Sequence, residues 1–203
     1  RAVHSLGGIY YSAEDVGVSV SDIAEATRET PFMLGLNEGK WGSGDPSPIT
    51  ADGVFRATLR AAKRLWGQGD LNGLTIAVQG VGHVGGYLCD HLHKAGARLV
   101  VTDVNEPVLR EVAERTNAEI VAPDAIYDVA ADIYAPCALG ATLNNDTLPR
   151  LKVKAVVGAA NNQLATPEIG QKLFDMGILY GPDYLVNAGG ITNVASELRA
   201  RET

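Results

Sequence analysis

Beyond residue 74 the chain alternates between short, continuous apolar runs and stretches with the periodicity of an amphipathic helix. The apolar runs cover residues 74–80, 98–104, 118–122, 132–138, 154–160 and 177–182. The helical patterns cover residues 84–96, 106–117, 147–152 and 166–177. Apolar runs without polar alternation are typical of strands buried on both faces, as in a parallel sheet covered by helices. The pattern therefore predicts an α/β fold with a doubly wound, mostly parallel sheet.

The first part of the chain has a weaker pattern, in which we expect one helix. Ser21 is a suitable N-cap for a helix over residues 22–30, and Pro31 would end it. Residues 37–48 are dense in turn formers and are expected to form a linker or an exposed loop.

A long helix is expected directly after this linker. Ser47 followed by Pro48 combines an N-cap residue with a proline at the first helical position. An apolar stripe then runs to Gly67, where the helix should end. The pattern therefore divides the chain near residue 48, ahead of the alternating strands and helices.

Composition excludes several classes of protein. The 203 residues are 46% hydrophobic and 20% charged, which is ordinary for a globular chain. A net charge of −7 argues against nucleic acid as the main partner, because phosphate binding needs a basic surface. The apolar runs are too short to span a bilayer, so no membrane association is expected. We expect a cytoplasmic protein, because only two cysteines are present and they form no disulfide framework.

The segment "VQGVGHVGGYL" carries a glycine fingerprint of the form G-x-G-x-x-G, made by Gly80, Gly82 and Gly85. It follows a predicted strand and opens a predicted helix, which is the context that makes this motif informative. Gly80 would allow the tight turn, Gly82 the approach of a pyrophosphate and Gly85 the packing of helix on strand. The motif predicts a Rossmann dinucleotide site, with His83 and Val84 of the same loop beside the phosphates.

Asp103 ends the second predicted strand, 23 residues after Gly80. A carboxylate at this place accepts hydrogen bonds from the adenosine ribose and repels a 2′-phosphate, so NAD is favoured over NADP. We assign Asp103 and the following Val104 to the cofactor site. The alternative is that Asp103 only caps the next helix.

A metal site is not expected. Cys89 and His93 stand four residues apart on one helix, a spacing that suits a metal ion. No further ligand accompanies them, so a core thiol beside a surface histidine is the favoured interpretation.

Seven segments in this order resemble the glutamate, leucine, phenylalanine and valine dehydrogenase superfamily, and its leucine and phenylalanine dehydrogenase branch most of all. They are "YYSAEDVG", "GDPSPITADGV", "VQGVGHVGGYL", "VVTDVN", "YAPCALGATLN", "VVGAANNQL" and "YLVNAGGITNVASEL". The resemblance implies NAD-dependent oxidation of an L-amino acid to a 2-oxo acid and ammonia. It also implies that residues 1–47 are a remnant of a substrate domain plus linker, and that residues 48–203 are the NAD-binding Rossmann domain.

The resemblance also implies roles for single residues. Asp15 matches the aspartate that exchanges protons with the substrate nitrogen, a task that suits a carboxylate within hydrogen-bond reach. Further cofactor contacts are implied for Thr50, Cys137, Ala138, Leu139, Asn161, Asn162 and Asn187. Contacts with the substrate side chain are implied for Leu185, Ala188, Gly189 and Ile191.

The family's active site also uses lysines, one of them in a glycine-rich segment upstream of the aspartate. The six lysines of this chain all follow Asp15, so we expect the isolated chain to bind NAD but to be catalytically incomplete. The substrate-side segment is apolar, which favours a hydrophobic amino acid of the leucine or valine type, with phenylalanine as the other candidate. A non-catalytic NAD-binding module and a hydroxy-acid dehydrogenase are the alternatives. The full-length enzyme is expected to be a homo-oligomer.

Overall fold

The computed structural model describes residues 1–13, 17–36 and 42–201. Their contacts divide the chain into two compact units, Arg1–Ile49 with Gly189–Thr203, and Thr50–Ala188. The contacts thus group the end of the chain with its beginning, whereas the expected cofactor domain ran to residue 203; that domain assignment stays a prediction. Part of the expected linker, residues 37–41, lies outside the described residues.

Among its described residues the first unit contains a pair of short parallel strands, several helices and the start of α3 (Ser47–Trp66). Its elements are α1 (Ala2–Ser5), β1 (Ser12–Ala13), α2 (Val20–Ala26), β2 (Met33–Leu34) and α8 (Gly189–Arg201). Glu197 of α8 is buried, and its carboxylate accepts hydrogen bonds from the N–H of Gly35 (2.9 Å) and from the N–H (2.7 Å) and hydroxyl of Ser43 (2.5 Å). Within this unit a buried carboxylate therefore holds the chain that follows β2.

The helix expected at residues 22–30 forms, but with other ends. Ser19 caps α2, not Ser21: the Ser19 hydroxyl accepts from the N–H of Asp22, whose carboxylate accepts from the N–H of Ser19. This reciprocal pair satisfies two N–H groups at once, which the Ser21 hydroxyl alone would not do. The helix stops at Ala26, well before Pro31.

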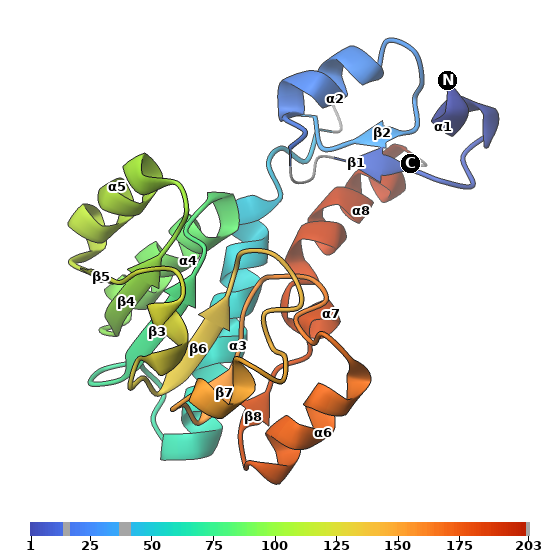
Figure 1. The fold of residues 1–203 in the computed structure, drawn as a ribbon. Helices are drawn as coiled ribbons and strands as arrows, with labels where there is room; N and C mark the ends of the chain where they lie inside the picture. Colours follow the sequence, from blue (N-terminus) through green and yellow to red (C-terminus); the bar gives the residue numbers. More distant parts are fainter. Residues whose placement is uncertain (14–16, 37–41, 202–203) are drawn as a thin grey trace. The chain divides into compact units, whose positions relative to one another are not determined.

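The second unit is a parallel sheet with helices on both faces, as the sequence predicted (Figure 1). Its strands are β3 (Thr75–Gln79), β4 (Arg98–Thr102), β5 (Glu119–Ile120), β6 (Ile133–Pro136), β7 (Ala155–Val156) and β8 (Leu179–Tyr180). Its helices are α3 (Ser47–Trp66), which starts in the first unit, α4 (His83–Lys94), α5 (Glu106–Thr116), η1 (Ala125–Asp128), η2 (Leu148–Arg150), α6 (Pro167–Asp175) and α7 (Asp183–Val186). The helix expected over residues 147–152 is only the single 3₁₀ turn η2.

The strand order is β5-β4-β3-β6-β7-β8, and every neighbouring pair is parallel. The chain thus builds outward from β3 in one direction and then, from β6, in the other. This is the Rossmann arrangement, in which the first and fourth strands lie side by side at the switch point.

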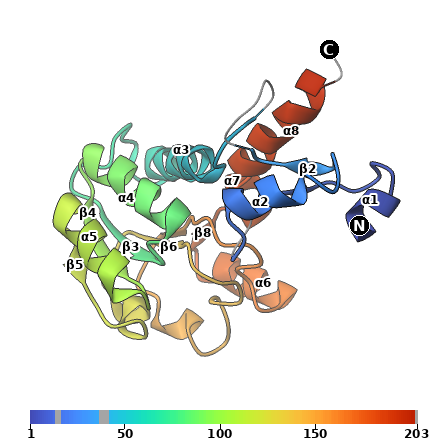
Figure 2. The same cartoon turned by 90° about the horizontal axis from the view of Figure 1, so that it is seen from above.

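Helices lie on both faces of the sheet (Figure 2), and two clusters of buried apolar side chains fill the space between helices and sheet. Ile76 and Val78 of β3 face α3, α4 and α5, whereas Ala77 between them faces η1, η2 and α6. Residues alternate between the faces of a strand, so continuous apolar runs supply both clusters. No helix among the described residues is both long and apolar enough to cross a membrane.

Backbone packing at the carboxyl end of β7 generates a stability prediction. A Cβ on Gly158 would lie 2.2 Å from the carbonyl oxygen of Pro136 and 2.5 Å from its nitrogen, so Gly158→Ala forces β6 and β7 apart. We expect a loss of about 2–3 kcal/mol of unfolding free energy, at the upper end of overpacking costs. Urea unfolding followed by circular dichroism measures it.

Gly69→Ala is the matched control, because no atom lies within 4 Å of the place that its Cβ would take and its backbone is not left-handed. Its unfolding free energy should stay within about 0.5 kcal/mol of the parent. Equal stability of the two variants would contradict the close approach of Gly158 to Pro136.

Candidate functional site

The carboxyl ends of all six strands lie at one edge of the sheet, because all strands are parallel. The loops that follow β3 and β6 leave this edge from adjacent strands at the switch point. Ligands of open α/β sheets bind at this place. Most of the cofactor residues expected from the sequence lie in the loops of this edge.

The loop after β3 touches the loop after β6 through the backbone. Gly80 has a φ of +91°, and a Cβ on it would lie 2.7 Å from the nitrogen and 2.8 Å from the Cα of Ala138. A Cβ on Gly85 would lie 2.0 Å from the carbonyl oxygen of Gly80 and 3.3 Å from the Cβ of Cys137. Both positions therefore require glycine, one for the turn and one for packing α4 onto the strand.

Gly82 is different, because no atom lies within 4 Å of where its Cβ would be. It is the N-cap of α4, and no described side chain caps this helix end. The first-turn N–H groups of His83, Val84 and Gly85 therefore lack an intrahelical partner, and the helix dipole is positive there. His83 is exposed and Val84 half-buried. This arrangement suits a phosphate group.

Asp103 is held beside the glycine loop. Its carboxylate accepts hydrogen bonds from the N–H of Val81 (2.7 Å) and the N–H of Asn105 (2.8 Å). The alternative that Asp103 caps α5 is wrong, because the side chain of Asn105 accepts from Val108 and makes that cap. Val104 is 90% exposed. A half-buried carboxylate and an apolar side chain thus follow β4 together.

The loop after β6 starts at Cys137, whose N–H donates to the carbonyl oxygen of Gln79 (2.7 Å). Burial raises the pKa of the Cys137 thiol to about 12, so the group is a thiol at neutral pH. Ala138 and Leu139 are exposed, Leu139 by 72%. Leu139 offers an apolar surface at the switch point.

The loops after β6 and β7 are in direct backbone contact. A Cβ on Gly140 would lie 2.7 Å from the carbonyl oxygen of Asn161 and 2.9 Å from that of Asn162. The N–H of Ala141 donates to the same Asn162 oxygen (2.7 Å). Asn162 has a φ of +52°, a conformation in which asparagine is better tolerated than most residues.

Helix α7 is fastened to the β7 loop at both of its ends. The carboxylate of Asp183 accepts from the N–H of Asn162 (2.5 Å). The side-chain amide of Asn187 donates to the side-chain oxygen of Asn161 (2.5 Å) and to the carbonyl oxygen of Ala159 (3.0 Å). The loop after β6, the loop after β7 and helix α7, which carry expected cofactor residues, are therefore connected to one another. We call these three segments the rim.

The expected substrate residues are divided between the units. Leu185 in α7 is 69% exposed, and Ala188 is half-buried. Gly189 begins α8, and Ile191 of that helix is 74% exposed; both belong to the first unit.

The two remaining expected residues are Thr50 and Asp15. Thr50 is half-buried in the first turn of α3. The expected catalytic residue Asp15 lies outside the described residues, so its role stays a prediction.

Two residues that support the rim were not predicted from the sequence. Gln163 is fully buried, and its amide donates to the carbonyl oxygens of Gly158 and Ala160, which shapes the β7 loop. Asp183 is the second. Its only signal was an acidic residue after a proline at a helix start, which is common. Among the described residues no three His, Cys, Asp or Glu side chains are grouped so that they could hold a metal ion.

Known proteins resemble this chain over almost its whole length. The sequence profile of glutamate/leucine/phenylalanine/valine dehydrogenases matches residues 42–111 and 101–202. Leucine dehydrogenase of Bacillus cereus is 50% identical over 198 residues, covering 98% of this chain and 54% of the enzyme. Valine dehydrogenase of Streptomyces coelicolor is 48% identical over 201 residues, covering 98% of this chain and 55% of the enzyme.

A similar solved structure is L-tryptophan dehydrogenase from Nostoc punctiforme, with a TM-score of 0.82 and 40% identity. The match covers 98% of this chain and 56% of that one. The chain therefore spans about half the length of the relatives that it matches. By its match over residues 42–202 and these likenesses, the chain belongs to the glutamate/leucine/phenylalanine/valine dehydrogenase family.

Proposed function

We propose that the chain is the NAD-binding part of an amino-acid dehydrogenase. The observation that carries this proposal is the pairing of an open Gly82 at the start of α4 with a fixed carboxylate, Asp103, one strand away. The first suits a pyrophosphate and the second suits ribose hydroxyls. Membership of the dehydrogenase family supports the same assignment.

The expected cofactor residues can be divided between the two ends of a dinucleotide. Gly80, Gly82, His83, Val84 and Gly85 would hold the pyrophosphate, and Asp103 with Val104 the adenosine. Cys137, Ala138, Leu139, Asn161, Asn162, Asn187 and Thr50 would lie toward the nicotinamide. When bound, NAD supplies the acceptor for the hydride that leaves the substrate Cα.

The substrate class is a hydrophobic L-amino acid, of the leucine or valine type or phenylalanine. Exposed Leu185 and Ile191 and small Ala188 and Gly189 are available to an apolar side chain. The relatives named leucine and valine dehydrogenase support this class.

Asp15 would take the proton from the substrate ammonium group, since the nitrogen must be deprotonated before the Cα hydride leaves. A lysine of the family pattern would stabilise charge on the oxygen of the intermediate, which is often the largest contribution to catalysis. No lysine precedes Asp15 in these 203 residues. A cytoplasmic location and assembly of the whole enzyme as a homo-oligomer remain predictions.

Cofactor binding can be tested on the chain itself. NAD should bind to the parent more tightly than NADP, because the carboxylate of Asp103 repels a 2′-phosphate. Asp103→Ala should weaken NAD binding by about 10- to 100-fold, since a hydrogen bond to a charged group contributes about 1.5–3 kcal/mol. It should also reduce the preference over NADP. Isothermal titration calorimetry measures both dissociation constants.

Glu114→Gln is the control, because Glu114 is an exposed acid on α5, away from the rim. It should bind NAD as the parent does. A folded parent chain that binds no NAD would refute the proposed function.

Catalysis generates a separate prediction. The 203-residue chain, incubated with NAD and leucine, valine or phenylalanine, should produce NADH at a rate close to that of the reaction without protein. The physical reason is the missing lysine charge. NADH absorbance follows the reaction. Steady turnover that Asp15→Asn abolishes would show that the isolated chain is catalytically complete.

A further inference from the structure

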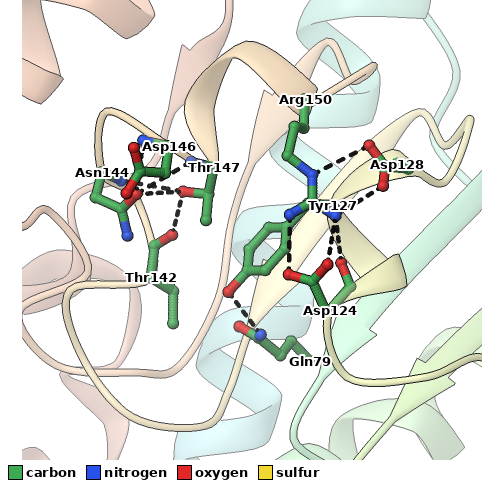
Figure 3. A network of polar contacts seen from close by, with 9 residues as sticks. All are labelled: Gln79, Asp124, Tyr127, Asp128, Thr142, Asn144, Asp146, Thr147 and Arg150. Carbon is green, nitrogen blue, oxygen red and sulfur yellow. Dashed lines mark hydrogen bonds and ion pairs between the residues drawn. The ribbon is translucent and has the colours of Figure 1, made fainter.

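The segment from Cys137 to Arg150 follows β6, and both of its ends are connected to Gln79. The first residue is bonded to Gln79 directly, and the last residue is connected to it through other side chains. Gln79 is the last residue of β3, directly before the glycine loop. Its carbonyl oxygen accepts the N–H of Cys137, where the segment starts (2.7 Å). The segment ends in η2, beside η1 (Figure 3). We call residues 137–150 the strap.

Arg150 fastens the end of the strap to η1. Its guanidinium donates to the carboxylate of Asp124 (2.9 and 3.0 Å), to the carbonyl oxygen of Asp124 (2.7 Å) and to the carboxylate of Asp128 (2.7 and 3.2 Å). These hydrogen bonds lower the pKa of both carboxyl groups. One side chain therefore holds both ends of η1, as Figure 3 shows.

Arg150, Asp124 and Asp128 together form what we call the clamp. Tyr127 connects the clamp to the sheet. The Arg150 guanidinium carbon lies 5.3 Å from the centre of the Tyr127 ring, a cation–π distance. The Tyr127 hydroxyl accepts from the side-chain amide of Gln79 (2.9 Å), and the hydroxyl of the buried Tyr134 donates to the Gln79 amide oxygen (2.5 Å). Gln79 thus receives the strap's first residue on its backbone and the clamp on its side chain.

The middle of the strap is held by its own side chains. Asn144 accepts from the N–H groups of Asp146 (2.9 Å) and Thr147 (3.0 Å), and the Thr147 hydroxyl donates to the carbonyl oxygen of Thr142 (2.6 Å). The backbone of Leu143 is also bonded to the β7 loop, because its N–H donates to the carbonyl oxygen of Gln163 (3.0 Å) and its carbonyl oxygen accepts from the N–H of Ala165 (2.9 Å). The turn connects η2 to the residues on the cofactor side. A displacement of η2 would therefore reach residues 138–141.

Arg150 could act by positioning the strap or by stabilising the whole fold, and the solvent exposure of the clamp bears on which effect is larger. Exposed ion pairs contribute little to global stability, because solvent screens them. Both carboxylates are more than half exposed, whereas the Arg150 side chain is 29% exposed, so we expect the clamp to make only a moderate contribution to the stability of the whole fold. It joins two short 3₁₀ turns, η1 and η2, whose buried side chains Ile126 and Leu148 also lie in one apolar cluster. Its main effect should be local.

We propose that Arg150 is a positioning residue, which through Asp124, Asp128 and Tyr127 fixes the strap and thereby the nicotinamide side of the cofactor site. The inference rests on the proposed function. It assigns to Arg150 no contact with cofactor or substrate.

The test compares two ligands on the full 203-residue chain by calorimetry. ADP-ribose would occupy the glycine loop and Asp103, whereas NAD would also reach the strap. Arg150→Gln and Tyr127→Phe should each raise the Kd for NAD about fivefold, as loss of positioning does, and change that for ADP-ribose less than about twofold. The double variant should have about the same Kd for NAD as the single variant that binds NAD more weakly. The reason is that both substitutions interrupt the same connection between Arg150 and Gln79.

Arg110→Gln is the matched control, since Arg110 makes a single exposed ion pair with Glu106 (2.8 Å) on α5. It should bind both ligands as the parent does. Unchanged NAD binding in Arg150→Gln would overturn the proposal. So would equal weakening of NAD and ADP-ribose, which is what a general loss of stability would cause.

Hydrogen exchange without ligand separates this proposal from the proposed function. In Arg150→Gln, amides of residues 138–147 should exchange about tenfold faster than in the parent, with residues 80–86 unchanged. If the parent binds no NAD, the proposed function fails and the cofactor role of Arg150 fails with it. The exchange data then still test whether Arg150 fixes the strap. Unchanged exchange in the strap of Arg150→Gln would refute that role.

Discussion

The carboxyl edge of the parallel sheet depends on one steric constraint, the contact of Gly80 with the backbone of Ala138, where no Cβ fits. This contact brings the loops after β3 and β6 together at the switch point. Gly85 on the same loop and Gly140 on the other make further approaches of the same kind. Side chains then fasten the remaining loops to this base. Backbone packing sets the site's dimensions, and polar side chains set its details.

The sequence predicted the sheet because its signal is local. Each buried strand is a continuous apolar run, and the three glycines of the fingerprint lie within six residues of one another directly after the first of these strands. The parallel sheet, its helices on both faces and family membership are confirmed. The helix ends were less well predicted: Ser19, not Ser21, caps α2 because Asp22 reciprocates only with Ser19.

Arg150 and Asp183 could not be predicted as supporting residues, because their partners are far away in the sequence. Arg150 lies more than twenty residues from both of its carboxylate partners, and Asp183 lies 21 residues from Asn162. Neither residue carries a motif, and a charged surface side chain is ordinary by itself. Only the fold brings η1 beside η2 and α7 beside the β7 loop.

Under the proposed function Asp103 would have two tasks, and this would limit how a preference for NAD could evolve. The carboxylate that would repel a 2′-phosphate is also the acceptor for the N–H of Val81 in the glycine loop. A neutral or basic residue in place of Asp103, which could accommodate the 2′-phosphate, would leave this N–H without its partner. A lineage changing to the phosphorylated cofactor would therefore need a second substitution that supplies a new acceptor. Such paired requirements make a trait slow to change.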